Sequence, residues 1–286
     1  MLLGIHTSIS KGYAASIEEG EEKGAEIIQI FVRQNLTWNK KIVLEDEITE
    51  FRNRLTESKS IKRVIAHCSY LINLASDNKT TVKRSISLLA DELLICKSLG
   101  IDIYVIHPGS HKGVGIEEGK RKIIEGLRLV REKTKDLNIS IAFETTAGSG
   151  HQIGASLTEL ADLISKTKSI FKPALCIDTA HLFAAGYDIN EESEYEKLVE
   201  EIDEIIGLNK LLVCHFNDCT VELGSKKDRH QHIGKGRIKL DTFKRFIRDK
   251  RLSNVVGVLE TPKGVGSDGV DYDKINLQIL KSLRDE

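Results

Sequence analysis

The sequence contains little proline, methionine or tryptophan, and it has no long apolar run. Its 286 residues include three prolines, one methionine and one tryptophan. No apolar stretch approaches the about 18 residues that span a bilayer, and residues 1–5 are too few to form the core of a signal peptide. These absences argue against disordered, fibrous and membrane-spanning proteins, and we expect a cytoplasmic protein.

Cysteine spacing and net charge exclude further classes. The five cysteines are an odd number with no Cys-x-x-Cys pair, which argues against a disulfide framework and a zinc ribbon. We expect them to be buried apolar residues. Basic and acidic residues number 42 and 43, so the chain lacks the global basic field of many DNA-binding modules. Any attraction for phosphate must therefore be local.

Short β-branched apolar runs alternate with longer stretches of helical periodicity, which indicates repeated βα units. Helices are expected, for example, over 79–99, 116–135 and 191–206, and a long polar loop over 217–236. We see no linker, so we expect a single α/β domain over residues 1–286, a (β/α)8 TIM barrel. A doubly wound open sheet is the alternative, but no G-x-G-x-x-G pattern follows the first strand. The eight expected strands are 2–6, 27–32, 64–67, 103–107, 139–144, 174–178, 211–215 and 255–260.

Most of the expected strands end in a residue that can bind a metal. All strand C-termini of such a barrel open onto one face, so these side chains should converge there. Asp178 with His181 and Asp228 with His230 have spacings that allow each pair to reach a common centre. The seven strand-end residues are His6, His67, His107, Glu144, Asp178, His215 and Glu260.

A single histidine or carboxylate at a strand end is more often a hydrogen-bonding residue than a metal ligand. The joint set differs, because crowded buried carboxylates and imidazoles without a cation would suffer repulsion and desolvation. Such ligands without thiolate suit zinc, with manganese or iron as substitutes. Grouped ions can activate a water and stabilise the charges of phosphodiester hydrolysis. The expected ligands, leaving out His6, are His67, His107, His181, His215, His230, Glu144, Asp178, Asp228 and Glu260.

Seven ordered motifs across nearly the whole chain resemble the endonuclease IV family. They are HCSYLINLA (67–75), HPGSH (107–111), ETTAG (144–148), DTAHLFAAGYD (178–188), HFNDC (215–219), ELGSKKDRHQHIGKG (222–236) and LETP (259–262). The resemblance implies a DNA-repair hydrolase that cuts double-stranded DNA 5′ to an abasic site, leaving a 3′-hydroxyl and a 5′-deoxyribose phosphate. It also implies trimming of blocked 3′ ends.

The resemblance further implies three zinc ions per chain, with Glu144 as the bridging, catalytic carboxylate. His6 is expected to support the ligands without binding metal itself. The implied ligand sets are His67, His107 and Glu144; Glu144, Asp178, His215 and Glu260; and His181, Asp228 and His230.

The family bends duplex DNA and extrudes the abasic nucleotide. Tyr70 and Leu71 match its wedge into the base stack, with ordinary packing as the alternative. Leu36 stands where the family often has a basic or polar residue, so we expect at most an apolar substitute. Trp38 is expected either to stack on a base or to anchor its loop. Expected phosphate contacts are Lys226 and Arg229, together with Lys40, Lys41, Lys227, Lys235 and Arg237.

Two other functions stay open at this stage. A metal-dependent sugar isomerase or epimerase of a related barrel would need only one or two ions, whereas Asp228 and His230 with His181 favour a third. A non-catalytic protein that binds damaged DNA would use structural zinc, which is normally bound in closed, thiolate-rich sites. We expect the chain to act as a monomer.

Overall fold

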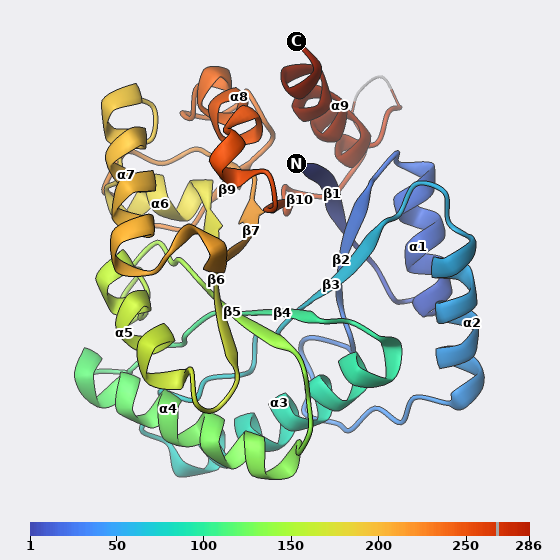
Figure 1. Cartoon of the computed structure of the whole chain (residues 1–286), viewed down its shortest axis with the longest axis vertical. Helices are drawn as coiled ribbons and strands as arrows, with labels where there is room; N and C mark the ends of the chain where they lie inside the picture. The colour runs from blue at the N-terminus through green and yellow to red at the C-terminus, as the bar shows by residue number, and fades with distance from the viewer. Residues whose placement is uncertain (267–268) are drawn as a thin grey trace.

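Eight parallel strands close into a barrel in the computed structural model, which describes residues 1–266 and 269–286 (Figure 1). Their order around the barrel is β1-β10-β7-β6-β5-β4-β3-β2. Each barrel strand therefore pairs with the barrel strands that precede and follow it along the chain, and β10 closes the barrel against β1. The predicted (β/α)8 barrel is confirmed. The strands are β1 (Leu2–Thr7), β2 (Ile27–Phe31), β3 (Arg63–His67), β4 (Ile103–Ile106), β5 (Ser140–Glu144), β6 (Lys172–Asp178), β7 (Leu211–His215) and β10 (Val256–Leu259).

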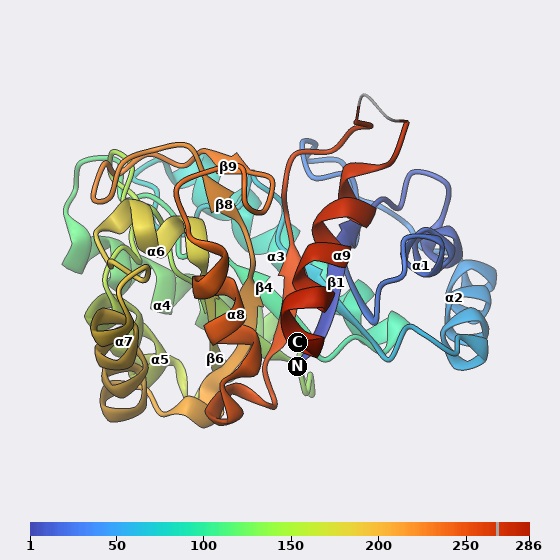
Figure 2. The ribbon, with the colours of Figure 1, turned by 90° about the horizontal axis from the view of Figure 1, so that it is seen from above.

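The helices surround the strands on the outside of the barrel (Figures 1 and 2). Within the described part of the chain, no helix is both long and apolar enough to cross a membrane. The helices are α1 (Tyr13–Glu22), α2 (Glu45–Glu57), α3 (Lys79–Leu99), α4 (Ile116–Lys133), α5 (Leu157–Thr167), α6 (Thr179–Ala185), α7 (Glu192–Ile205), α8 (Leu240–Arg248) and α9 (Tyr272–Asp285), with short 3-10 turns at Leu208–Lys210 and Lys250–Leu252.

Side-chain alternation along the strands divides the core into two layers. A small cluster drawn only from strand residues fills the barrel interior with Ile, Val, Ala and one Cys. A larger cluster, formed by the other strand residues and the helices, lies between the strands and the outer ring. The inner positions recur every second residue, as at Ile65 in β3, Ala142 in β5 and Val213 in β7.

The same alternation turns the strand-end residues toward the barrel axis. Two residues beyond Ile65, Ala142 and Val213 stand His67, Glu144 and His215. In each of these strands, the inward-facing position after the apolar one is therefore a polar residue, and it lies at the open end of the barrel. The β2 strand repeats this pattern with Ile27 and then Gln29, a residue that the sequence reasoning did not single out.

Several expected boundaries differ from the structure by one or two residues, and one expected loop contains strands. His107 and Glu260 lie one residue beyond β4 and β10, because their backbones have already left the strand pairing. The expected loop 217–236 is not without structure: β8 (Asp218–Cys219) and β9 (His230–Gln231) form a two-stranded antiparallel sheet within it. Strands this short leave no periodic signal in a sequence.

Truncating the aromatic cluster behind β7 should weaken the fold. Phe216, directly after His215, packs edge-on against Phe243 and Phe246 of α8 at 6.3 and 6.4 Å between ring centroids. We expect Phe246→Ala to lower the free energy of unfolding by about 3–5 kcal/mol, because it leaves a cavity in a fully buried cluster. Urea unfolding would measure it. The partly exposed Leu129→Ala should cost less than about 1 kcal/mol, and an equal loss would contradict this packing role.

Candidate metal centre

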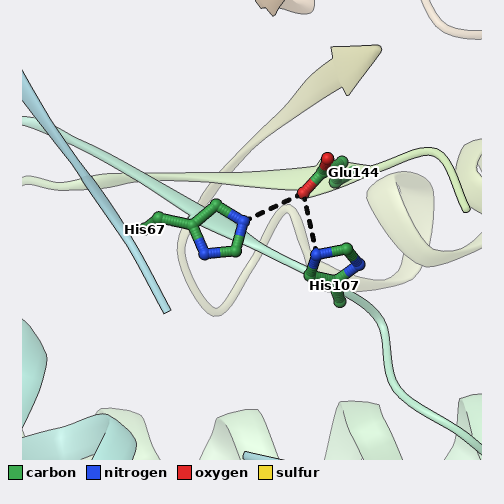
Figure 3. Close-up of side chains that lie close together, drawn as sticks. All are labelled: His67, His107 and Glu144. Atoms are coloured by element: carbon green, nitrogen blue, oxygen red, sulfur yellow. Dashed lines mark hydrogen bonds and ion pairs between the residues drawn. The ribbon is translucent and has the colours of Figure 1, made fainter. Parts of the chain in front are cut away.

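His67 and His107 converge on one oxygen of Glu144 at the open end of the barrel (Figure 3). The Nε2 atoms of His67 and His107 lie 3.1 and 3.3 Å from Glu144 Oε2. The three residues come from the ends of β3, β4 and β5, and their ligand atoms lie within 4.8 Å of one another. This group has the same members as the first expected zinc site.

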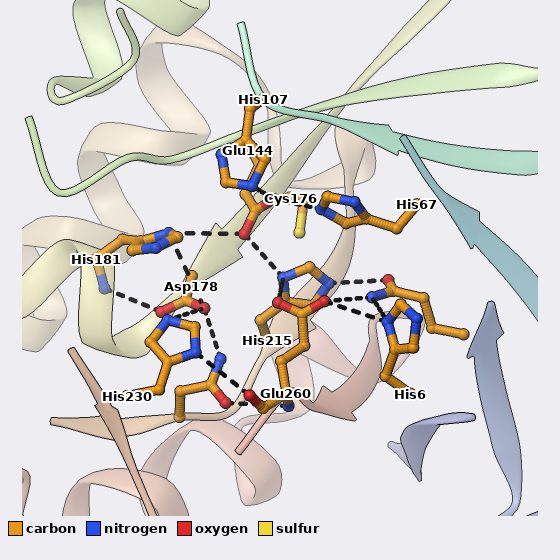
Figure 4. Close-up of polar contacts among 12 residues, drawn as sticks. His6, His67, His107, Glu144, Cys176, Asp178, His181, His215, His230 and Glu260 are labelled. Carbon is orange, nitrogen blue, oxygen red and sulfur yellow. Dashed lines mark hydrogen bonds and ion pairs between the residues drawn. The ribbon is translucent and has the colours of Figure 1, made fainter. Parts of the chain in front are cut away.

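The other oxygen of Glu144 faces a second group from β6, β7 and β10. His215 Nδ1 lies 2.9 Å from Glu144 Oε1 and 3.3 Å from Glu260 Oε2. With Asp178, these residues again place one ligand atom each within 4.8 Å of the others. Glu144 therefore stands between two groups, as a bridging carboxylate requires (Figure 4).

The third group forms where α6 begins. Asp178 caps this helix by accepting a hydrogen bond from His181 N at 2.9 Å, so both side chains lie on one side of the turn. His181 Nε2 and His230 Nε2 lie 3.3 and 3.2 Å from the two oxygens of Asp228. Asp178, His181 and His230 place one ligand atom each within 4.8 Å of the others, so Asp178 lies between the second and third groups. The sequence spacing predicted that Asp178 and His181 reach a common centre, whereas the ligand sets implied by the family resemblance placed Asp178 in the second group alone.

Backbone and amide groups hold three of the imidazoles in a fixed orientation. His67 Nδ1 lies 2.9 Å from Cys68 O, His181 Nδ1 lies 2.8 Å from Thr145 O, and His215 Nε2 lies 3.0 Å from Gln29 Oε1. Because these oxygens only accept hydrogen bonds, the facing nitrogen must carry the hydrogen. The opposite nitrogen of each neutral ring then offers its lone pair to the common centre.

The donor set therefore fits divalent cations. Each of the three oriented rings presents a lone pair toward carboxylate oxygens that also only accept hydrogen bonds. His230 Nε2 is buried and has no hydrogen-bond partner among the residues that the structure describes, although it faces Asp178 and Asp228. A cation bound between these groups would accept the lone pairs of the imidazoles and the carboxylates, and it would also give His230 Nε2 a partner.

Sequence reasoning missed two amides that connect the ligands. Gln29 Nε2 donates to Glu260 Oε1 at 2.6 Å, while its oxygen faces His215. Asn217 Nδ2 donates to Asp178 Oδ2 at 2.7 Å, and its Oδ1 accepts from Glu260 N at 3.0 Å. The signal for Gln29 was its place at an inner position of a strand, whereas Asn217 lies in a motif quoted for its neighbouring histidine.

His6 lies beside the centre but outside its ligand groups. Its Nδ1 is 3.1 Å from Gln29 Nε2 and 3.5 Å from Glu260 Oε1. All five cysteines are buried, as expected. Cys176 alone among them lies within 4.8 Å of Glu144 and His215 in the described chain, and burial raises the pKa of its thiol well above the ordinary value.

Without a cation, protons on the imidazoles balance the carboxylates. Burial alone would raise the pKa of the Glu144 carboxyl, but His107 and His215 hold it well below its usual range. Burial alone would lower the pKa of His181, but the charge of Asp178 and the hydrogen bond with Asp228 raise it to about 10. Metal binding near neutral pH would therefore displace protons.

Two loops beside the centre expose apolar side chains. Tyr70 is 63% exposed, and its ring packs 5.3 Å from that of Phe31. Leu36 is 73% exposed and lines a cavity of about 990 Å³ with His6, Lys40 and Lys41.

The neighbouring candidates Leu71 and Trp38 are partly buried against the core, unlike Tyr70 and Leu36. The Arg84 guanidinium lies 5.9 Å from the centroid of the Trp38 ring, and this packing favours a loop anchor over a free stacking platform.

A buried carboxylate forms hydrogen bonds to the loop that carries Tyr70. Glu92 of α3 accepts hydrogen bonds from Ser69 N, at 3.3 Å, and from the hydroxyls of Ser69 and Tyr104. Burial raises the pKa of Glu92, although these bonds act in the opposite direction. The helix thereby fixes the backbone next to Tyr70.

The expected phosphate-binding residues lie in loops around the centre. Lys226, Lys227, Arg229 and Lys235 are exposed in the segment between β8 and α8. Three of the expected cations also pair with carboxylates: Lys40 with Asp91 at 3.7 Å, Lys41 with Glu47 at 3.5 Å, and Arg237 with Glu222 at 2.6 Å. Lys226, Lys227, Arg229 and Lys235 are therefore the better candidates for contact with DNA.

Comparison with known proteins first defines the class. The family model described as xylose isomerase-like TIM barrel matches residues 17–283. A D-tagatose 3-epimerase-like protein of known structure has a TM-score of 0.72 and 18% identity over 100% of this chain and 97% of its own, which shows a shared fold alone.

Closer relatives define the family. The probable endonuclease 4 of Geotalea daltonii is 38% identical over 281 residues, covering 98% of this chain and 97% of that protein. The solved structure of endonuclease IV from Thermus thermophilus has a TM-score of 0.85 and 32% identity, covering 100% and 99% of the two chains. The chain belongs to the endonuclease IV family.

The metal-free protein should lose part of its stability at alkaline pH. The folded-state pKa of His181 lies near 10, above the ordinary 6.5, so its contribution is fully present below about pH 6.5 and is lost as the pH rises through about 10. Urea unfolding of metal-free protein and His181→Gln across this range would measure it. We expect the difference between the two free energies of unfolding to shrink toward pH 10; a difference that grows would contradict the raised pKa.

Proposed function

We propose that the protein is a DNA-repair endonuclease that hydrolyses the phosphodiester bond 5′ to an abasic site, leaving a 3′-hydroxyl and a 5′-deoxyribose phosphate, and that it also trims blocked 3′ ends. The observation that carries this is the convergence of imidazoles and carboxylates on Glu144 and Asp178 in three adjoining groups. Family membership supplies the reaction class. We further propose that the protein works in the cytoplasm as a monomer with one domain over residues 1–286.

We propose three zinc ions per chain, with manganese or iron as possible substitutes. When bound, such ions supply an activated water and positive charge for the attacked phosphate and the leaving oxygen. Glu144 would bridge the first two, and Asp178 and Asp228 would both face the third. The proposed ligands are His67, His107, Glu144, Asp178, His181, His215, Asp228, His230 and Glu260.

The chain's own contribution is to hold these groups in place before substrate arrives. Gln29 and Asn217 both bond to the segment at Glu260, so the two amides fix its carboxylate and its backbone. Thr145 orients His181 through its carbonyl oxygen and caps Asp178 N through its hydroxyl at 2.9 Å. Such prior orientation lowers the reorganisation that hydrolysis requires.

Double-stranded DNA with an abasic or 3′-blocked lesion is the proposed substrate. The exposed Tyr70 suits a wedge that opens the base stack, and extrusion costs least where a base is already missing. Leu36 would add an apolar contact, whereas Leu71 and Trp38 would support the two loops from within. Lys226 and Arg229 would contact phosphates.

The sugar-epimerase alternative is disfavoured by the third group of ligands. His181 and His230 meet Asp228, which extends from a loop rather than from a barrel strand. A single ion between Glu144 and Glu260 would leave this outer group without a role.

Replacing the bridging carboxylate should abolish strand cleavage. Glu144→Gln keeps the shape but removes the charge shared by two groups, and we expect incision of a labelled duplex with one abasic analogue to fall by at least about a thousandfold. Gel analysis would measure it with metal-loaded and metal-stripped protein. The exposed Glu125→Gln on α4 is the control, and unchanged cutting by Glu144→Gln would refute the bridging role.

Truncating the exposed tyrosine should affect DNA binding before hydrolysis. We expect Tyr70→Ala to weaken binding of an abasic duplex by about tenfold or more, by loss of about 1–3 kcal/mol of stacking, while hydrolysis of a small phosphodiester stays near the wild-type rate. Fluorescence anisotropy and a chromogenic assay would separate the two. Equal losses in both assays would contradict the wedge.

A further inference from the structure

We propose that Asp218 is a positioning residue that closes the loop carrying Asp228 and His230, and so prepares the third ligand group before metal binds. The inference rests on the proposed function for the identity of the bound ions, but the closure itself is a property of the metal-free chain. Asp218 is fully buried, directly follows Asn217, and belongs to none of the ligand groups found among the described residues.

The carboxylate of Asp218 accepts three backbone hydrogen bonds. Its Oδ1 accepts from Cys219 N at 2.8 Å and from Ile238 N at 2.9 Å, and its Oδ2 accepts from Gly236 N at 2.8 Å. Two of these donors lie 18 and 20 residues further along the chain. One buried side chain therefore joins the beginning of the loop to its end.

Gly236 allows this closure because it has no side chain. A Cβ atom at this position would collide with Asp218 Oδ1 and with the carbonyl oxygen of Cys219. Arg237 N adds a bond to Cys219 O at 2.8 Å, which reinforces the same junction. The close approach of the two loop ends therefore depends on the carboxylate of Asp218 at one end and on the missing side chain of Gly236 at the other.

Asp228 and His230 lie between this junction and a second point where the loop is bonded to the rest of the fold. On the far side, Gly224 N and Lys226 N donate to Phe183 O and Ala184 O at 3.1 and 2.9 Å, near the end of α6. His230 pairs with Cys219 in the small sheet of β8 and β9. The segment that carries Asp228 and His230 is therefore fixed at both ends, although neither residue lies on a barrel strand.

A carboxylate suits this role better than an amide. All three partners are N–H donors, and an ionised carboxylate offers only acceptors. In Asp218→Asn, the side-chain NH2 group would replace one acceptor oxygen and face a backbone N–H. Two donors would then oppose each other, and a buried N–H would have no partner. The variant therefore tests closure with almost no change in volume.

The first experiment measures the loop in the metal-free protein. We expect amide hydrogen exchange of residues 219–237 to accelerate by at least about tenfold in Asp218→Asn and in Gly236→Ala, with the barrel strands still protected. The exposed Leu223→Ala, in the same loop, is the matched control and should exchange like wild type. Unchanged exchange in both variants would overturn the proposal, whether or not the protein cuts DNA.

The second experiment separates positioning from general stability. Both variants should retain about one fewer zinc ion per chain than wild type after dialysis, and added zinc should restore abasic-duplex incision in Asp218→Asn but not in Glu144→Gln. Loss of every ion, or failure of both variants to fold while Leu223→Ala folds, would overturn the proposal by showing that Asp218 supports the whole fold. Accelerated exchange with no incision by the wild type would sustain loop closure and refute the proposed function instead.

Discussion

Mutual repulsion and desolvation of crowded polar groups govern the open end of this barrel. Glu144 and Asp178 are fully buried among imidazoles, where an uncompensated charge is unfavourable. In the metal-free chain, protons on His181 and His215 supply the compensation: burial alone would lower their pKa values, but the charge of Asp178 raises that of His181 and the charges of Glu260 and Glu144 raise that of His215. Divalent cations would compensate the same carboxylates at neutral pH, and the surrounding amides and carbonyls would keep the ligands oriented in either condition.

The sequence predicted the barrel and most of the candidate site because both depend on periodicity. Alternation along each strand determines which side chains face the axis, and closure brings the strand ends together whatever their separation in the chain. The proximity of His67 to Glu144 needs no more than this.

What the sequence could not supply depends on tertiary contacts. Gln29 and Asn217 are neutral amides whose importance appears only through their partners. The i, i+3 spacing brings Asp178 to His181, but the sharing of Asp178 between the second and third groups depends on how closely those groups approach in the fold. The closure of the loop by Asp218 involves backbone amides, and these carry no sequence signature.

The overall charge of the chain is near zero, so the proposed function requires any affinity for phosphate to be local. The barrel strands fix the proposed ligands, whereas the exposed Tyr70 and Leu36 lie on loops held by buried side chains such as Glu92. The proposed metal ligands and the proposed DNA contacts thus lie mostly on different parts of the chain.

The two-residue repeat of the inner positions also constrains how such a barrel can change over time. Inserting or deleting one residue within β5 would reverse the facing of every side chain beyond that point and turn Glu144 toward the helices. Changes of length in the connecting segments carry no such penalty. Relatives of this chain should therefore accumulate gaps after the strands and almost none inside them.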